Sequence, residues 1–376
     1  MSKKKKIDAN KLGEIRKLLD EGGFEKLIAA FDLLDSHGAL DEDYAKLFTK
    51  TRIKKLITGD GPMFNFLAGR LLQFRSAFLN IKEGIKGFSQ NNFEYLIADL
   101  TELSDGAAKI LSGLNWHALR LDGYNAEGGP TFISDNAAES LSKFGGLLYL
   151  NGLGELSDKA AESLSKYKGG RLALCGISKL SDAAAESFSR FKGDNLDLDG
   201  VTSLSDAAAN SLSKCTCCLS FSGLLSLSES AAKSLSKSKS NSLNLSGLTS
   251  LSESAVKSLS QYKGNHLYLA GMDSLSDSAA ESLSKYKGWL CLDGLNVLSD
   301  SAVHRLSTFK GKSLSLEGVK KLSDQQAKSL SNLSNDLSLL GLDELSDTAA
   351  QYFAKSRAYL NFPFELREKI NQYRES

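Results

Sequence analysis

The residues in this sequence that are best suited to metal binding or redox chemistry are the cysteines of the segment CTCC, at residues 215–218. Thiolates bind zinc and take part in redox chemistry, so three thiols within four residues indicate a metal or redox site as one interpretation. A zinc site usually needs a fourth ligand at similar spacing, and the sequence has no second C-x-x-C and no histidine pair one helical turn apart. We therefore favour buried thiols without a chemical role, and keep metal binding or redox sensing as the alternative.

Other catalytic signatures are missing from the sequence. The histidines lie far apart, at His37, His117, His266 and His304. Serine is abundant, but neither a G-x-S-x-G motif nor a phosphate-binding loop motif occurs, and the segment GLGELS at Gly152 lacks the third glycine of a dinucleotide-binding loop. The sequence therefore predicts a protein that is not an enzyme and has no cofactor.

The framework that positions most side chains of this chain is a repeat of 23 or 24 residues. The pattern L-x-L-x-G-[LIVM]-x-x-L-S-[DE] begins at Leu148, Leu172, Leu196, Leu219, Leu243, Leu267, Leu290, Leu314 and Leu337. A truncated copy begins at Leu360, and looser copies begin at Leu119 and Tyr95. About twelve units therefore span residues 95–362, and near-verbatim recurrence indicates architecture, because a catalytic residue is needed only once.

The first half of each unit is predicted to be a short strand. In LYLAGM, for example, Leu267 and Leu269 alternate with Tyr268 and Ala270, so the leucines face the interior. Gly271 then turns the chain. Strands that are joined through a crossover helix are parallel, and a unit too small to bury its own apolar face gains a core only by stacking on its neighbours.

The second half of each unit is predicted to be a helix. Ser276-Asp277 supplies a capping oxygen and an acid for the positive end of the helix dipole. The side chains that share one face of this helix are Leu275, Ala279, Leu283 and Tyr286. Gly288 is predicted to end the unit in a left-handed cap. The two halves together predict an α/β solenoid, a curved array with a concave parallel β-sheet and convex helices.

This repeat resembles a leucine-rich repeat. Its form, L-x-L-x-G-x-x-x-L-S-D-x-A-A-x-x-L-x-x-Y, is similar to the cysteine-containing subclass of F-box-type adaptors and to bacterial leucine-rich repeat proteins with Ser-Asp-x-Ala-Ala helices. Tyr or Phe stands where that subclass has its second cysteine, at positions such as Tyr167 and Phe191. In the same alignment, Cys215 takes the interior place of Tyr167 and Cys217 the place of Gly169, so we do not expect the thiols to converge.

The ends of the chain and one insertion depart from the period. Residues 1–94 contain segments such as NKLGEIRKLLDEGG with apolar residues at helical spacing, which predicts an all-α N-terminal domain or cap. Residues 363–376, PFELREKINQYRES, are predicted to form a C-terminal capping helix. Residues 124–132, YNAEGGPTF, lengthen one unit by a loop that is either a contact site or a tolerated insertion.

The composition of the chain limits which cellular compartment and which classes of binding partner are expected. Lys plus Arg (46) nearly balances Asp plus Glu (45), so nucleic acid and anionic membranes are not predicted partners, with Lys3–Lys6 as the place where a minor nucleic-acid alternative would act. No apolar run is long enough to span a membrane, and no apolar signal region follows the basic start. The odd cysteine count, with Cys175, Cys215, Cys217, Cys218 and Cys291, suits a reducing compartment. We expect a cytoplasmic protein.

The positions that differ between units are those that should point out of the concave sheet, just before, between and just after the two strand leucines. The predicted partner-binding residues at these positions are Tyr149, Asn151, Arg171, Asn195, Asp197, Asp199, His266, Tyr268, Trp289, Asp293 and Glu317. The other positions of the repeat are nearly identical from unit to unit. We therefore expect the residues that determine binding specificity to lie at these variable positions.

Two patches within this surface have distinct chemistry. His266, Tyr268 and Trp289 fall on adjacent strands, about 4.8 Å apart, and have the composition of a binding hot spot, although aromatic rings also serve simply to cover a sheet. An acidic patch, two or three strands away, consists of Asn195, Asp197 and Asp199. We therefore expect a non-enzymatic scaffold that binds a protein partner, with a basic segment of that partner facing the acids. The alternative is a regulatory or effector subunit that tethers or restrains an enzyme, for example in a bacterial defence or host-interaction system.

Overall fold

The structure is a computed structural model, and it describes residues 9–21, 26, 29–30, 33, 95–97, 103, 105–113, 117–121 and 130–374. The chain forms two compact units, Met1–Leu153 and Gly154–Ser376. The predicted helical segments that follow residue 33 and most of the insertion at 124–132 lie outside the described residues. The domain boundary predicted after residue 94 stays a prediction.

The first unit contains helix α1 (Ala9–Glu21) and the beginning of the repeats. Its repeat elements are β1 (Tyr95–Ile97), α7 (Asp105–Ser112), β2 (Ala118–Arg120), α8 (Asp135–Leu141) and β3 (Leu147–Tyr149). The strands pair in parallel, with Leu119 opposite Leu148. The looser copies identified in the sequence therefore form strands of the same kind as the regular ones.

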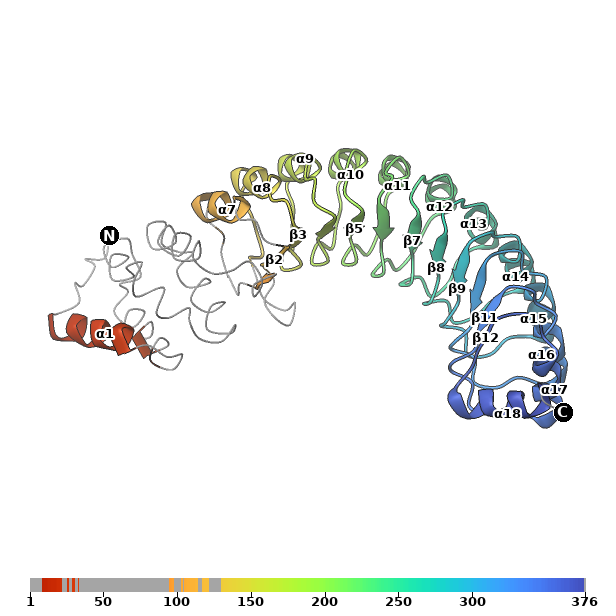
Figure 1. Ribbon diagram of the computed structural model, residues 1–376. Coiled ribbons are helices and arrows are strands. Elements are labelled where there is room, and N and C mark those ends of the chain that lie inside the picture. The colour runs from red at the N-terminus through yellow and green to blue at the C-terminus, as the bar shows by residue number, and fades with distance from the viewer. Residues whose placement is uncertain are drawn as a thin grey trace. The chain divides into compact units, whose positions relative to one another are not determined.

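The second unit is a curved solenoid with one strand and one helix in each repeat. Its strands are β4 (Arg171–Ala173), β5 (Asn195–Asp197), β6 (Cys218–Ser220), β7 (Ser242–Asn244), β8 (His266–Tyr268), β9 (Trp289–Cys291), β10 (Ser313–Ser315), β11 (Asp336–Ser338) and β12 (Leu360–Asn361). Its helices are α9 (Asp158–Leu164), α10 (Asp182–Phe188), α11 (Asp206–Leu212), α12 (Glu229–Leu235), α13 (Glu253–Leu259), α14 (Asp277–Leu283), α15 (Asp300–Leu306), α16 (Asp324–Leu330), α17 (Asp347–Ala354) and α18 (Phe364–Arg374). Figure 1 shows the strands of this unit on the inner side of the curve and the helices on the outer side.

Leucine columns build the core between the two layers. Neighbouring strands pair in parallel with their leucines in register, as Leu267 is with Leu243 and with Leu290. Leu267 and Leu269 are both fully buried, as the period of two predicts. The predicted concave parallel sheet and convex helices are therefore confirmed.

Serine and acid side chains join the helices of successive repeats. Ser299 caps α15 by accepting a hydrogen bond from the Ala302 backbone N–H at 2.9 Å. The Ser299 hydroxyl also donates to Asp277 Oδ1 in the preceding helix at 2.9 Å. Ser181 makes the same bond to Asp158. The recurring Ser-Asp pair therefore both caps each helix, as predicted, and links it to the next repeat.

The helices end earlier than the sequence predicts. Helix α14 stops at Leu283, with Ser284 in right-handed helical conformation at its C-cap, so Tyr286 lies beyond the helix and not on its face. Tyr286 is still fully buried, and its hydroxyl donates to the Gly264 carbonyl at 2.8 Å. Two further turn bonds, Lys285 N to Ser282 O and Tyr286 N to Leu283 O, bring the ring into the core.

Gly288 does not take the predicted left-handed cap, because its φ lies outside the left-handed region. A Cβ at Gly288 would lie 2.3 Å from the Tyr286 hydroxyl and 2.4 Å from the Asn265 carbonyl oxygen. At the turn after β8, a Cβ on Gly271 would lie 2.2 Å from the Ser246 carbonyl oxygen of the preceding repeat. Both glycines are thus required by close stacking, not by backbone conformation.

The segment predicted as a C-terminal helix contains α18, which packs on the last full repeat. Lys369 Nζ donates to the Leu345 carbonyl at 2.6 Å and lies 2.7 Å from Asp347 Oδ1. Phe353 and Phe362 meet edge to face beneath it, with ring centroids 4.9 Å apart. A search of the described residues finds no helix with the length and apolar character needed to cross a membrane.

Candidate interaction surface on the strand face

The strand face of the second unit presents three rows of side chains, as the sequence predicts. The row before the first leucine includes Arg171, Asn195, His266 and Trp289; the middle row includes Asp197 and Tyr268; the row after the second leucine includes Asp199, Asp293 and Glu317. All of these side chains are half-buried or exposed, while the leucines between them are buried. The strand alternation therefore places every predicted binding residue of this unit on one face.

His266, Tyr268 and Trp289 form one aromatic cluster across β8 and β9. The His266 ring stands edge-on to Trp289 at 5.2 Å and is stacked on Tyr268 at 6.2 Å, and Tyr268 and Trp289 are tilted at 6.1 Å. Trp289 is 40% exposed. Burial raises the pKa of the Tyr268 hydroxyl. This cluster offers a partner a large aromatic surface.

The carboxylates on this face also serve the fold, which the sequence did not reveal. Asp199 Oδ1 accepts from the Ser222 backbone N–H at 2.8 Å and from the Ser220 hydroxyl at 2.5 Å. Asp293 Oδ1 does the same further along the array, accepting from the Glu317 backbone N–H at 3.0 Å and from the Ser315 hydroxyl at 2.6 Å. Each acid thus satisfies a donor of the next repeat, where it would otherwise be left without an acceptor.

Among the described residues, the carboxylates of two other acids of the predicted surface have only side-chain partners. Asp197 Oδ2 lies 3.3 Å from Arg171 Nε, and Glu317 Oε1 accepts from the Ser338 hydroxyl at 2.7 Å. Burial raises the pKa of the Asp197 carboxyl, and Asp199 adds to this effect, whereas Arg171 opposes it. Ionised Asp197 is therefore held on this face at some cost to stability.

Cys291, in the middle row of β9, is a buried free thiol. It is buried, and burial together with Asp293 raises its pKa to about 12. Its Sγ lies 2.9 Å from Asp293 Oδ2. Because the thiolate is the nucleophilic form, the raised pKa disfavours the reactive form of this residue near neutral pH.

Tyr149 and Asn151 belong to the first unit. Tyr149 ends β3, and the Arg120 guanidinium lies over its ring at 5.0 Å from the centroid. Arg120 was not among the predicted residues, although it occupies the same middle row on β2. A cation–π contact of this kind is the structural explanation for Tyr149, and its role in partner binding stays a prediction.

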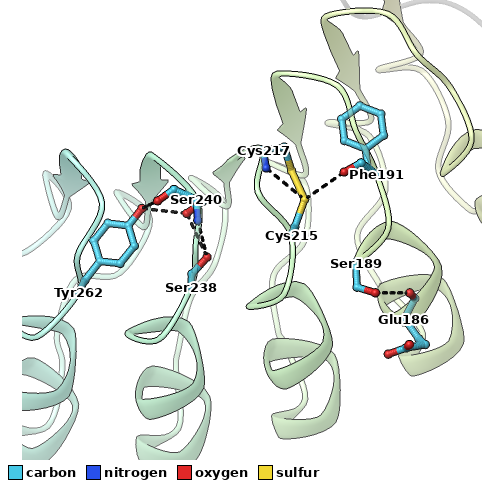
Figure 2. The surroundings of a disulfide bond; sticks show 8 residues. All are labelled: Glu186, Ser189, Phe191, Cys215, Cys217, Ser238, Ser240 and Tyr262. Atoms are coloured by element: carbon cyan, nitrogen blue, oxygen red, sulfur yellow. Dashed lines mark hydrogen bonds between the residues drawn. A yellow bond between two sulfur atoms is a disulfide. The ribbon is translucent and has the colours of Figure 1, made fainter.

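Cys215 and Cys217 do converge, against the expectation from the sequence. They form a disulfide, and both are buried (Figure 2). Cys218 begins β6 and remains a free thiol. The described residues contain no group of three or more His, Cys, Asp or Glu side chains that could hold a metal ion.

The geometry of the other repeats explains why these two positions meet. A Cβ at Gly264 would lie 2.1 Å from the Tyr262 hydroxyl, so the residue two positions after the core aromatic faces that aromatic. An aromatic ring at the first position therefore requires glycine at the second. Where the first residue is small, a second small side chain fits, and the Ser238 and Ser240 hydroxyls accordingly lie 3.1 Å apart in the next repeat (Figure 2).

Parallel strands in register, one helix per repeat and buried leucine columns define this architecture. The chain has the leucine-rich repeat fold. A scan of protein-family models and a search of curated proteins find no match.

Among solved structures, an internalin of Listeria monocytogenes aligns over 72% of this chain and 86% of its own, at 15% identity and a TM-score of 0.44. A leucine-rich repeat protein of Leptospira interrogans aligns over 73% of this chain and 74% of its own, at 14% identity and a TM-score of 0.38. Yeast Rad7, solved in complex with Elc1, aligns over 94% and 92%, at 15% identity and a TM-score of 0.42.

Proposed function

We propose that this protein is a non-enzymatic scaffold that binds a protein partner on the strand face of its second unit. The observation that carries the proposal is the aromatic cluster of His266, Tyr268 and Trp289, with Trp289 40% exposed. Hot spots of protein interfaces are rich in tryptophan and tyrosine, because such side chains bury a large area at little cost in conformational entropy. On the two flanking strands, β7 and β10, the outward residues have no aromatic ring: they are Ser242 and Asn244 on β7, and Ser313 and Ser315 on β10.

The charge of the same face supports a basic segment in the partner. The outward positions of β4 to β11 carry five acidic residues, Asp197, Asp199, Asp293, Glu317 and Asp336, against one arginine, Arg171. Complementary charge speeds association and excludes partners of the wrong sign. If the partner is an enzyme, the chain would act as a tethering or restraining subunit through the same surface.

A peptide selection tests this proposal and does not require the partner to be identified. A random-peptide library is selected on the wild-type protein, and the enriched peptides are measured against Trp289→Ala. Val297→Ala is the matched control, because Val297 is 80% exposed in the loop between β9 and α15 and is not on the strand face.

We expect the enriched peptides to be rich in Lys and Arg and to bind Trp289→Ala about tenfold more weakly or worse. Binding to Val297→Ala should be unchanged. Circular dichroism verifies that both variants are folded. Equal binding to the wild type and to Trp289→Ala would refute the assignment of this surface.

A further inference from the structure

A groove between helices α12 and α13, on the helix side of the second unit, has an unusual lining. It encloses about 520 Å³ and is lined by four lysines, Lys233, Lys237, Lys257 and Lys263, together with four serines and a glutamine. No acidic and no aromatic side chain lines it. The lining therefore carries four positive charges and no negative charge.

The corresponding grooves that follow α10 and α14 contain a carboxylate. Glu186 of α10 accepts from the Ser211 hydroxyl of α11 at 2.7 Å and lies 3.5 Å from Lys214. Glu281 of α14 accepts from Arg305 of α15 at 3.0 Å. In each case an acid in the fifth position of one helix is the acceptor for donors of the next helix.

In α12 and α13 this acid is replaced by lysine. Lys233 occupies the position of Glu186, and Lys257 occupies the same position one repeat later. Ser258 stands where Ser211 does, but no carboxylate of the described residues accepts its hydroxyl. Within the described part of the chain, none of the four lysines has an acidic side chain at ion-pair distance.

The helix dipole favours cations at all four lysine positions, but it does not explain why two of them stand where α10 and α14 have glutamates. Lys237 and Lys263 follow the ends of their helices, where cations are favoured and where most repeats also have a basic residue. Lys233 and Lys257 lie in the last turn of their helices, at the position where α10 and α14 have Glu186 and Glu281. Lys233 and Lys237 are moreover four residues apart, a spacing at which like charges destabilise a helix.

We propose that this groove binds a compact polyphosphate anion, a ligand with several phosphate groups and no aromatic part. Lysine binds phosphate as a flexible point charge, and arginine, which favours planar bidentate pairing with carboxylate or phosphate, is missing from this lining. The Ser254 and Ser258 hydroxyls can donate to the same oxygens. The lack of aromatic side chains gives a nucleobase nothing to stack on.

The volume also fits a small ligand, because pockets of about 300–1,000 Å³ are typical for small molecules. A phosphate group at this place would act as the acceptor that Glu186 and Glu281 provide in their own grooves. The proposal does not depend on partner binding at the strand face.

A groove of similar size serves as the internal comparison. Between α7 and α8, about 450 Å³ are lined by Lys109, Lys143 and Glu139 among others, and Lys143 lies 3.1 Å from Glu139. This groove is of similar size, but it has two lysines in place of four, and Glu139 pairs with one of them. We expect it to bind no polyphosphate.

Calorimetric titration of the full chain with inorganic tripolyphosphate, at low salt, tests the assignment. The decisive variant is Lys233→Glu/Lys257→Glu, which introduces residues native to the same helix position in α10 and α14 and should therefore fold. The control is Lys328→Glu, the same charge change at the same position of α16, outside the groove.

We expect saturable binding by the wild type, a loss of about 30-fold or more in the double variant and less than about twofold in Lys328→Glu. Glu139→Lys in the α7–α8 groove should raise tripolyphosphate binding. Equal weak binding by the wild type and the double variant would overturn the proposal. Failure of tripolyphosphate while polyglutamate or a single-stranded oligonucleotide binds the wild type would also overturn it, and would assign the groove to a macromolecule.

Discussion

The charged side chains of the strand face and those of the groove between α12 and α13 differ in what they contact. On the strand face, Asp199 and Asp293 each accept a backbone N–H of the following repeat, and Asp197 lies beside Arg171. In the groove, Lys233 and Lys257 stand where α10 and α14 have a carboxylate that accepts from the next repeat. These three aspartates of the strand face have hydrogen-bond or ion-pair partners within the fold, whereas the lysines of the groove have no acidic partner among the described residues.

This difference separates structural charge from charge that is open to a ligand. A buried or half-buried donor without an acceptor costs stability, so an acid that accepts a backbone N–H is explained by folding alone. A replacement that removes an acceptor and places like charges together has no such explanation. In a chain built of near-identical repeats, departures from the consensus are therefore better guides to a site than the charges themselves.

Asp293→Ala is expected to give the largest effect on stability. It removes the acceptor of the Glu317 backbone N–H and of the buried Ser315 hydroxyl, which should cost about 1–3 kcal/mol. Asp336→Ala is the control, because Asp336 is exposed on the same face and its side chain has no hydrogen-bond partner among the described residues.

Urea denaturation followed by circular dichroism measures both variants of this pair. The midpoint should fall clearly for Asp293→Ala and stay close to that of the wild type for Asp336→Ala. Equal midpoints would mean that the hydrogen bonds of Asp293 do not stabilise the fold. The distinction between structural acids on the strand face and unpaired lysines in the groove would then be wrong.

Lys233→Glu should instead stabilise the protein, by roughly 0.5–1 kcal/mol at low salt. The change turns a repulsive Lys233–Lys237 pair into an attractive pair of the kind that Glu162 and Lys166 form at 3.0 Å. Thermal unfolding at low and high salt measures the effect, which should shrink as salt screens the charges. Lys328→Glu is the comparison: Asn332 four residues on offers no charge, and the change also removes the contact of Lys328 Nζ with the Tyr352 ring, so no stabilisation is expected. A stability loss in Lys233→Glu would show that the groove lysines serve the fold.

Most of the fold is predictable from the sequence because the repeat determines both halves of each unit. Leu267 and Leu269, two residues apart, fix the strand, and Ser276 fixes the helix start. The end of the unit was less predictable. The reason for Gly288 lies in the ring of Tyr286 and the Asn265 carbonyl of another repeat, and such contacts exist only after the units stack.

The candidate interaction surface and the lysine groove were predictable only in part, because some of their contacts also form only when the repeats stack. Period-two alternation placed His266 and Trp289 on one face, and the structure brings their rings together. The meeting of Cys215 and Cys217 depends on the aromatic and glycine pairing of other repeats. The lysine groove was missed, although the segments ESAAKSLSKSKS and ESAVKSLSQYKG contain its signal, because a lysine on a helix normally indicates only a solvated face.

Asp197→Asn gives the smallest effect and tests the strand face through pH. The pKa of Asp197 is raised above its ordinary value of 3.8, chiefly by burial, so the folded state binds this proton more tightly than the unfolded state does. Stability from this group is therefore fully present at pH values below 3.8 and is lost as pH rises through the raised pKa. The neutral amide escapes that loss.

Asp197→Asn should consequently match or slightly exceed the wild type at pH 7, within about 0.5 kcal/mol, with the advantage vanishing in acid. Parallel thermal unfolding at both pH values measures it. Asp336→Asn is the control, because Asp336 is exposed at the start of β11 and its substitution should leave the difference between the two pH values small. A destabilised Asp197→Asn at pH 7 would mean that the pair with Arg171 outweighs burial, and that Asp197 belongs with the structural acids of this face.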